Sequence, residues 1–171
     1  YWVHDPIDGA VPSTALLDPA YIASRARAIQ RANGERPAPG LPPGIDRYPY
    51  GRPDRGIEQG TSQITIVDAS GNIASYTSSV ETIFGSRHLV GGMVMNNQLT
   101  DFAFTPIDKD QKLIANMAEG GKRPRSSMSP TIVFDKAGAP VLVIGSAGGS
   151  RIIGYVLQRI IAAVDWGMDM D

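Results

Sequence analysis

An apolar strand and a helix are joined in the stretch Pro140-Val141-Leu142-Val143-Ile144-Gly145-Ser146-Ala147-Gly148-Gly149-Ser150-Arg151-Ile152-Ile153. The nearly continuous apolar run at 140–144 predicts a strand that is buried on both faces. Apolar side chains then recur at the helical period as far as Val164, and Ser150 is the predicted cap of this helix. Backbone amides of Gly148 and Gly149 at a helix start could hold an oxyanion, although a close strand-to-helix turn explains the same glycines.

The rest of the sequence predicts further strands in the middle and another helix near the start. Asp18 and Pro19 suit the first positions of a helix over about 18–32. Alternating β-branched residues predict a hairpin, and a second hairpin ends in the apolar run above. The predicted strands are 63–68, 73–79, 93–95, 131–134 and 140–144, with hairpin turns at 68–72 and 135–139. The predicted class is α+β.

Composition excludes several kinds of site. The 171 residues contain no Cys, so a disulfide framework, a thiol nucleophile and a Cys-ligated metal are excluded. The two histidines show no metal-binding spacing, and we predict neither a metal nor a cofactor. Sixteen Lys and Arg against seventeen Asp and Glu give a net charge of −1, which provides no basic surface for nucleic acid. No apolar run reaches the roughly 18 residues of a membrane span.

Glycine and proline are concentrated before the first predicted strand. Residues 33–60 hold six Gly and six Pro, which predicts a long irregular loop. The sequence opens at Tyr1 without a leader and closes directly after an apolar helix. We therefore expect a fragment of a longer protein, truncated at both ends.

The Gly/Pro-rich loop ends at Gly60-Thr61-Ser62, where a hydroxyl nucleophile can arise without Cys or His. The Thr61 hydroxyl can attack the Gly60 carbonyl, shift the chain from nitrogen to oxygen and be freed by water. Thr61 would then carry an α-amine with an ordinary pKa of about 8, which can serve as the local base. A Thr that simply begins a strand is the alternative.

Two polar segments could bind the charged ends of an amino acid. Gln98 and Asp101 could bind an ammonium group, although Asx turns at a strand end explain the same residues. Ser126 and Ser127 could donate hydrogen bonds to a carboxylate, although they also suit an ordinary polar loop.

Taken in order, these segments resemble the γ-glutamyltranspeptidase family of N-terminal-nucleophile hydrolases. Residues from about Thr61 to the end carry the resemblance, and residues 1–60 resemble less specifically the end of the family's large subunit. The motifs are Gly60-Thr61-Ser62, Ile66-Val67-Asp68 with Gly71-Asn72, Phe84-Gly85-Ser86, Asn96-Asn97-Gln98 with Asp101-Phe102, Gly121-Lys122-Arg123-Pro124 with Ser126-Ser127-Met128-Ser129-Pro130, and Gly145 to Ile153.

The resemblance implies a four-layer αββα sandwich and a precursor that cleaves itself between Gly60 and Thr61. Residues 1–60 would be the C-terminal part of the large subunit, and 61–171 the N-terminal part of the small, catalytic subunit. The implied activity is transfer of a γ-glutamyl group from glutathione-like amides to water or an amino acid. The implied partners are this small-molecule substrate, its acceptor and the remainder of both subunits, and the implied location is periplasmic or extracellular.

The resemblance also implies roles for particular residues. Thr61 would be the nucleophile, with Ser79 as a second hydroxyl beside it and Thr77 supporting the processing step. Glu81, Gln98 and Asp101 would bind the ammonium group of the substrate, and Ser126 and Ser127 would bind its carboxylate. The backbone amides of Gly148 and Gly149 would stabilise the oxyanion.

The sequence departs from the family at several of these places. Gln63 stands where many members have His, Ser79 where they have Thr, and Glu81 where they have Asn. Arg125 replaces a commoner Leu, and the family's carboxylate-binding Arg of the large subunit has no assigned counterpart. The change at Glu81 leaves open a β-lactam side-chain acylase that acts on glutaryl or cephalosporin substrates.

The state of the Gly60–Thr61 bond decides what this chain can do. As one uninterrupted chain it has an amide where the free amine must be, and we expect it to be inactive. A third possibility is an unprocessed, non-catalytic relative that serves as a binding or structural domain.

Overall fold

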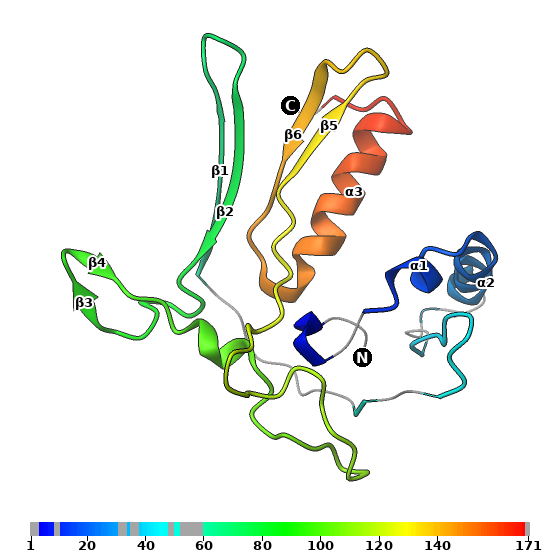
Figure 1. The fold of residues 1–171 in the computed structure, drawn as a ribbon. Coiled ribbons are helices and arrows are strands. Elements are labelled where there is room, and N and C mark those ends of the chain that lie inside the picture. Colours follow the sequence, from blue (N-terminus) through cyan, green and yellow to red (C-terminus); the bar gives the residue numbers. More distant parts are fainter. Residues whose placement is uncertain are drawn as a thin grey trace. The chain divides into compact units, whose positions relative to one another are not determined.

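The computed structural model describes residues 4–8, 11–30, 34, 38–47, 50–51 and 60–169, and these form two compact units. Half of the predicted loop at 33–60 lies outside the described residues. One unit comprises residues 1–54 and 102–125, and the other comprises 55–101 and 126–171. The helices and small antiparallel sheets (Figure 1) confirm the predicted α+β class.

The first unit contains the helices of the N-terminal segment. They are the short η1 (Pro6–Asp8), α1 (Ser13–Leu16) and α2 (Pro19–Gln30). Asp18 caps α2 as predicted, because its Oδ1 accepts a hydrogen bond from the Tyr21 N–H at 2.7 Å. The predicted helix end at 31–32 lies outside the described residues. Residues 102–125 complete this unit with irregular chain, in which Phe102, Ile114 and Ala115 are buried.

In its described residues, the second unit is built on three antiparallel hairpins and one long helix. The hairpins pair β1 (Thr61–Val67) with β2 (Ile73–Ser79), β3 (Leu89–Val90) with β4 (Met93–Val94), and β5 (Thr131–Phe134) with β6 (Pro140–Ile144). Two 3-10 turns, η2 (Gln98–Asp101) and η3 (Gly149–Arg151), flank the strands. Both predicted hairpins are confirmed, whereas the two-residue β3 was not predicted.

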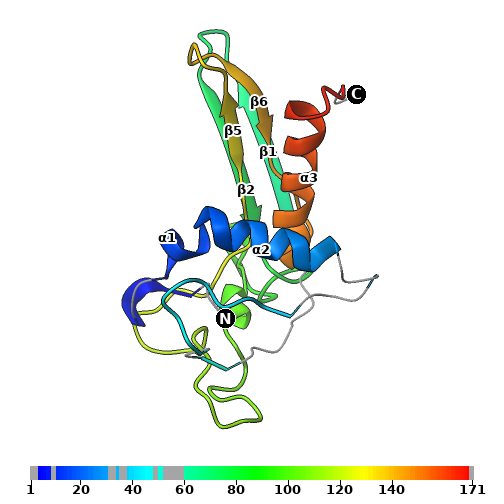
Figure 2. The same ribbon diagram turned by 90° about the vertical axis from the view of Figure 1, so that its right-hand side faces the viewer.

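Helix α3 (Ile152–Val164) lies along the β5–β6 hairpin (Figure 2). Ile144 packs there with Ile152 and Val156 of the helix, and Leu142 and Ile160 extend the cluster. The prediction that 140–144 is buried on both faces is wrong, since Val141 is 59% exposed. The reason is that β6 pairs with β5 alone and has α3 on one face among the described residues.

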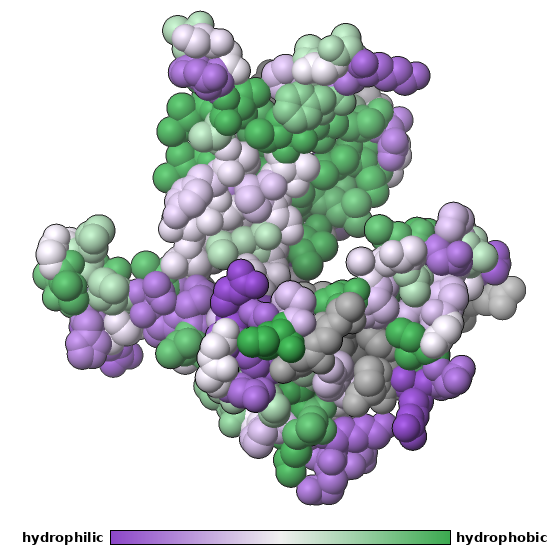
Figure 3. All heavy atoms as spheres, in the orientation of Figure 1, coloured by the Kyte–Doolittle hydropathy of each residue, from purple (hydrophilic) through white to green (hydrophobic). Residues whose placement is uncertain are grey.

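The predicted Ser150 cap is also wrong. Residues 149–151 form the turn of η3, and α3 begins one residue later with Arg151 at the cap position and no side-chain cap. Figure 3 shows hydrophobic residues gathered over the long hairpins and α3. No helix in the described part of the chain is long and apolar enough to cross a membrane.

Candidate functional site

The start of β1 holds the predicted nucleophile beside a second hydroxyl. Thr61 and Ser79 are paired across the β1–β2 ladder, and Thr61 Oγ1 donates a hydrogen bond to Ser79 Oγ at 3.1 Å. The backbone N–H of Glu81 donates to the same Ser79 oxygen at 2.9 Å. Ser79 Oγ is thus held on both sides, which fixes its position next to the threonine oxygen.

The predicted scissile carbonyl is also held. The Val80 N–H donates to the Gly60 carbonyl oxygen at 3.1 Å, so a donor already faces the oxygen on which charge would develop. Gly60 has φ of +149°, and an added Cβ would lie 3.0 Å from the carbonyl oxygens of Glu81 and Thr82. Backbone conformation and space therefore both favour glycine before Thr61.

A polar network links β1 and β2 to the end of β6. Thr77, which is buried, donates to Gln63 Oε1, and Gln63 Nε2 donates to Ser75 Oγ at 3.0 Å. Ser75 Oγ in turn donates to the Ile144 carbonyl at 3.3 Å. The Gln63 amide lies against Gly145, where an added Cβ would overlap it. Sequence reasoning did not find this network; the inward position of Gln63 in an alternating strand was the available signal.

The turn after β2 is fastened to the segment that carries Gln98 and Asp101. Asn97 Oδ1 accepts hydrogen bonds from the Thr82 N–H and the Thr82 hydroxyl, both at 3.1 Å. The Asn97 N–H donates to the Val80 carbonyl at 3.3 Å. Glu81, within this turn, is buried at 6% exposure and has φ of +75°. A buried carboxylate on a strained backbone is unusual, and such strain is concentrated at functional sites.

The other predicted binding residues lie on two segments of the same unit. Gln98 Nε2 donates to Asp101 Oδ2 within η2, so these two side chains are brought together. Ser126 Oγ accepts a hydrogen bond from the Met128 N–H at 3.1 Å and retains its own proton for donation. Ser127, half-buried, accepts through its carbonyl from the Ser129 hydroxyl.

The predicted oxyanion glycines occupy the turn that leads into α3. Gly148 has φ of +130° and Gly149 has φ of +56°, and both values favour glycine. An added Cβ at Gly148 would come within 2.8 Å of the Tyr155 ring. The Arg151 N–H donates to the Gly148 carbonyl at 3.1 Å, which closes η3.

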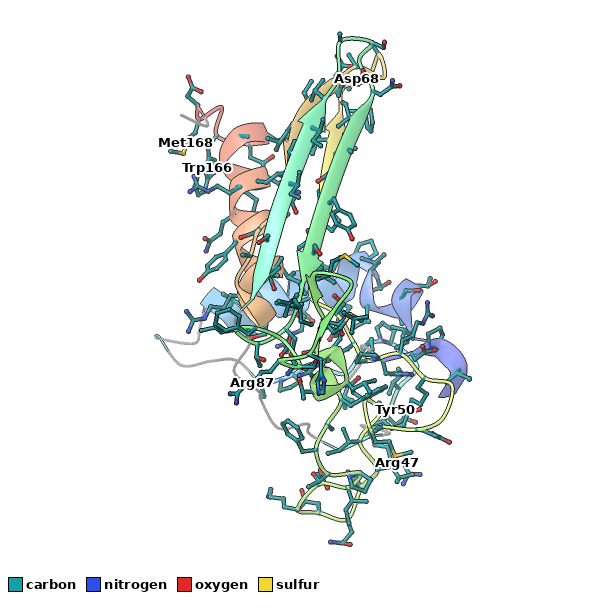
Figure 4. The ribbon with its side chains drawn as sticks, turned by 90° about the vertical axis from the view of Figure 1, so that its left-hand side faces the viewer. Arg47, Tyr50, Asp68, Arg87, Trp166 and Met168 are labelled. Atoms are coloured by element: carbon teal, nitrogen blue, oxygen red, sulfur yellow. The ribbon has the colours of Figure 1, made fainter. Side chains whose placement is uncertain are left out.

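A hollow of about 840 Å³ adjoins this segment. Gly145 and Ser146 line one side of it, and Tyr155, Trp166 and Met168 contribute from α3 and the chain that follows. Figure 4 shows Trp166 and Met168 beyond the end of α3, with Asp68 at the distant tip of the β1–β2 hairpin.

Comparison with known proteins identifies the class. The family model described as γ-glutamyltranspeptidase matches residues 1–171. A solved γ-glutamyltranspeptidase of Helicobacter pylori is 38% identical, with a TM-score of 0.55 over 64% of this chain and 61% of that one. The chain therefore belongs to the γ-glutamyltranspeptidase family.

Curated relatives give a more particular likeness. The "Glutathione hydrolase proenzyme" of Bacillus subtilis is 38% identical over 97% of this chain, and that of Escherichia coli is 37% identical over 99%. The chain spans 28% and 29% of the lengths of these two relatives. A protein of Arabidopsis thaliana named "Putative inactive glutathione hydrolase 4" is 39% identical over 62% of this chain and 59% of its own length.

Proposed function

We propose that the natural full-length protein cleaves itself between Gly60 and Thr61 and then transfers or hydrolyses γ-glutamyl groups of glutathione-like amides. The observation that carries this proposal is the arrangement at the junction. Thr61 Oγ1 donates a hydrogen bond to Ser79 Oγ, and the Gly60 carbonyl oxygen accepts a hydrogen bond from the Val80 N–H. A nucleophile with a hydroxyl partner thus adjoins a carbonyl whose oxygen is already held by a donor.

The cleavage step balances without a cofactor. Thr61 Oγ bonds to the Gly60 carbonyl carbon while its proton passes to the departing nitrogen, by way of Ser79. The Gly60–Thr61 C–N bond breaks, leaving an ester at Thr61 Oγ and a free α-amine. Water then hydrolyses the ester to a Gly60 carboxylate and a Thr61 hydroxyl.

The mature reaction repeats this chemistry on a substrate. Thr61 Oγ attacks the γ-amide carbon, and its α-amine accepts the hydroxyl proton and passes it to the leaving amine. Water or an amino acid then takes the acyl group from Thr61. The Gly148 and Gly149 amides stabilise the oxyanion in this proposal.

In this proposal the predicted binding residues hold the two charged ends of the substrate. Asp101, oriented by Gln98, and Glu81 would bind the substrate ammonium, and Ser126 with Ser127 would bind its carboxylate. This scheme is supported by the Gln98–Asp101 hydrogen bond and by the burial of Glu81. The complete protein would form the αββα sandwich, with residues 1–60 and 61–171 belonging to its large and small subunits.

The test measures cleavage and turnover together. Intact mass of the full-length protein should show two chains that meet at Gly60 and Thr61, and Thr61→Ala should remain one chain without turnover. A single uncut chain with full activity would refute the mechanism. Faster turnover of a glutaryl amide than of γ-glutamyl-p-nitroanilide would favour the acylase instead, since only the γ-glutamyl compound offers an ammonium to Asp101 and Glu81.

The word "inactive" in the name of the Arabidopsis relative favours one further candidate, a non-catalytic protein that serves as a binding or structural domain. In that case Thr61→Ala would leave mass, ligand binding and turnover all unchanged.

A further inference from the structure

One compact unit is assembled from both sides of the Gly60–Thr61 bond. It combines residues 1–54 with residues 102–125, which precede and follow the junction. Any contact between these two segments is an internal contact in the uncut chain. After the proposed cleavage it becomes a contact between two polypeptides, so this unit contains part of the interface between them.

Asp5 makes a charged side-chain contact across this interface. Its side chain is only 7% exposed, and its Oδ2 accepts hydrogen bonds from the Arg123 backbone N–H and from Arg123 Nε, both at 3.0 Å. The Ile7 N–H donates to Oδ1 at 3.1 Å. Three donors, one of them charged, therefore meet the Asp5 carboxylate, while the Arg123 side chain itself is 81% exposed.

Hydrogen bonds within residues 102–125 hold the backbone around Arg123. The neighbouring Lys122 is buried, and its ammonium donates to the Ala115 carbonyl at 3.0 Å and lies 3.8 Å from Glu119. Asn116 Oδ1 accepts from the Arg125 N–H at 2.9 Å. These bonds lie entirely within residues 102–125, so they hold the backbone on each side of Arg123 without any contribution from Asp5.

A second crossing contact lies at Gly51. Its N–H donates to the Leu113 carbonyl at 2.7 Å, and an added Cβ would lie 2.6 Å from the Asp108 carboxyl carbon. The two segments therefore approach each other closely at a backbone hydrogen bond. With Asp5, this provides two separate points of attachment.

We propose that the Asp5 carboxylate, through its hydrogen bonds to Arg123, is a clamp that holds the two products of cleavage together. The Gly51–Leu113 hydrogen bond is the second attachment between them. This inference rests on the proposed cleavage. The segment that contains Asp5 is the partner of residues 102–125, and Asp5 acts in assembly instead of catalysis.

The experiment measures release of one product from the other in the full-length protein. After cleavage is complete by intact mass, native mass spectrometry at increasing urea follows dissociation of wild type, Asp5→Ala and Arg123→Met. Asp5→Ala should dissociate about tenfold faster or more, since it removes charge-assisted bonds. Arg123→Met should have a smaller effect, because its backbone N–H still reaches Asp5.

Asp110→Ala is the matched control, because Asp110 pairs with the adjacent Lys109 on the same side of the junction and its side chain is 62% exposed. It should dissociate like wild type. The same variants in a Thr61→Ala background should release nothing. If wild type is cut but Asp5→Ala dissociates no faster than Asp110→Ala, the clamp alone is refuted. If wild type remains one chain, the cleavage proposal fails and the clamp fails with it.

Discussion

The side-chain amide of Gln63 lies directly against the backbone of Gly145, so the nucleophile strand meets the chain that leads to Gly148 and Gly149. Thr77 and Ser75 hold this amide in place through hydrogen bonds. The contact is possible because residue 145 has no Cβ. It gives the two halves of the proposed site, nucleophile and oxyanion segment, a common support.

Gly145→Ala should therefore lower the free energy of unfolding of the protein. The added methyl group displaces the Gln63 amide and breaks its hydrogen bonds to Thr77 and Ser75, at a cost of about 1–3 kcal/mol of unfolding free energy. Urea unfolding of the full-length protein measures this. Gly154→Ala is the control, because nothing lies within 4 Å of its Cβ position in α3. There alanine should stabilise by about 0.5–1 kcal/mol.

The double variant Gln63→Ala/Gly145→Ala separates this contact from a general backbone effect. Once Gln63 is truncated, the Gly145→Ala change should cost much less than it does alone, because the displaced amide is gone. Strictly additive losses in unfolding free energy would contradict the proposed contact.

Ser79→Ala should slow both cleavage and turnover. It removes the oxygen that accepts the hydrogen bonds of Thr61 and of the Glu81 N–H. A loss of one general acid–base participant corresponds to about 10²–10⁴-fold in rate. Single-turnover cleavage followed by mass spectrometry measures the first step. Ser78→Ala, on the opposite face of β2, is the comparison, and equal losses in the two variants would argue against a role for the Ser79 hydroxyl.

Three turns share the same aspartate hydrogen bonds and the same left-handed backbone at their fourth residue. In the turns that begin at Asp68, Asp108 and Asp135, the aspartate Oδ1 accepts from the N–H groups two and four residues later. The fourth residue has positive φ in each, and it is Gly71, Gln111 and Gly138 respectively. Gln111 is thus the one non-glycine at this position.

Gln111→Gly should stabilise the protein by about 0.5–1 kcal/mol, since relief of left-handed strain exceeds the entropy that glycine adds. Gly138→Ala should have the opposite sign, because its Cβ meets open space and only φ is penalised. Thermal unfolding of both variants checks the pair, and a destabilised Gln111→Gly would disprove the strain argument.

Asp5 predicts a dependence of stability on pH. The hydrogen bond from the Arg123 side chain, then those from the Ile7 and Arg123 N–H groups, lower the pKa of Asp5 to about 2. Because the folded pKa lies below the ordinary value of about 3.9, the stabilisation is complete above that value. It is lost as the pH falls towards about 2. The difference in stability between wild type and Asp5→Asn should shrink over that range, and a difference that grows there would contradict the assignment.

Local sequence patterns predicted most helices, strands and turns, whereas contacts between segments far apart in the sequence could not be predicted from them. The Asp18 cap and the turns at 68–72 and 135–139 were found because their bonding partners lie within a few residues. The Ser150 cap failed because η3 places one more turn before α3. The Gln63 network and the Asp5–Arg123 pair join residues far apart in sequence, where spacing carries no signal. The roles of the predicted site residues remain predictions.

The three aspartate turns also bear on the order in which the chain folds. Each closes within five residues, so the hairpins at Asp68 and Asp135 can form in about 1–10 μs. The bond from Ser75 to Ile144 spans 69 residues and carries a larger loop-closure entropy, so docking of one hairpin on the other comes later. The contact between the strand that carries Thr61 and the glycine segment at 145–149 is therefore expected to form after the two hairpins themselves, whereas the Thr61–Ser79 pair can form with the first hairpin.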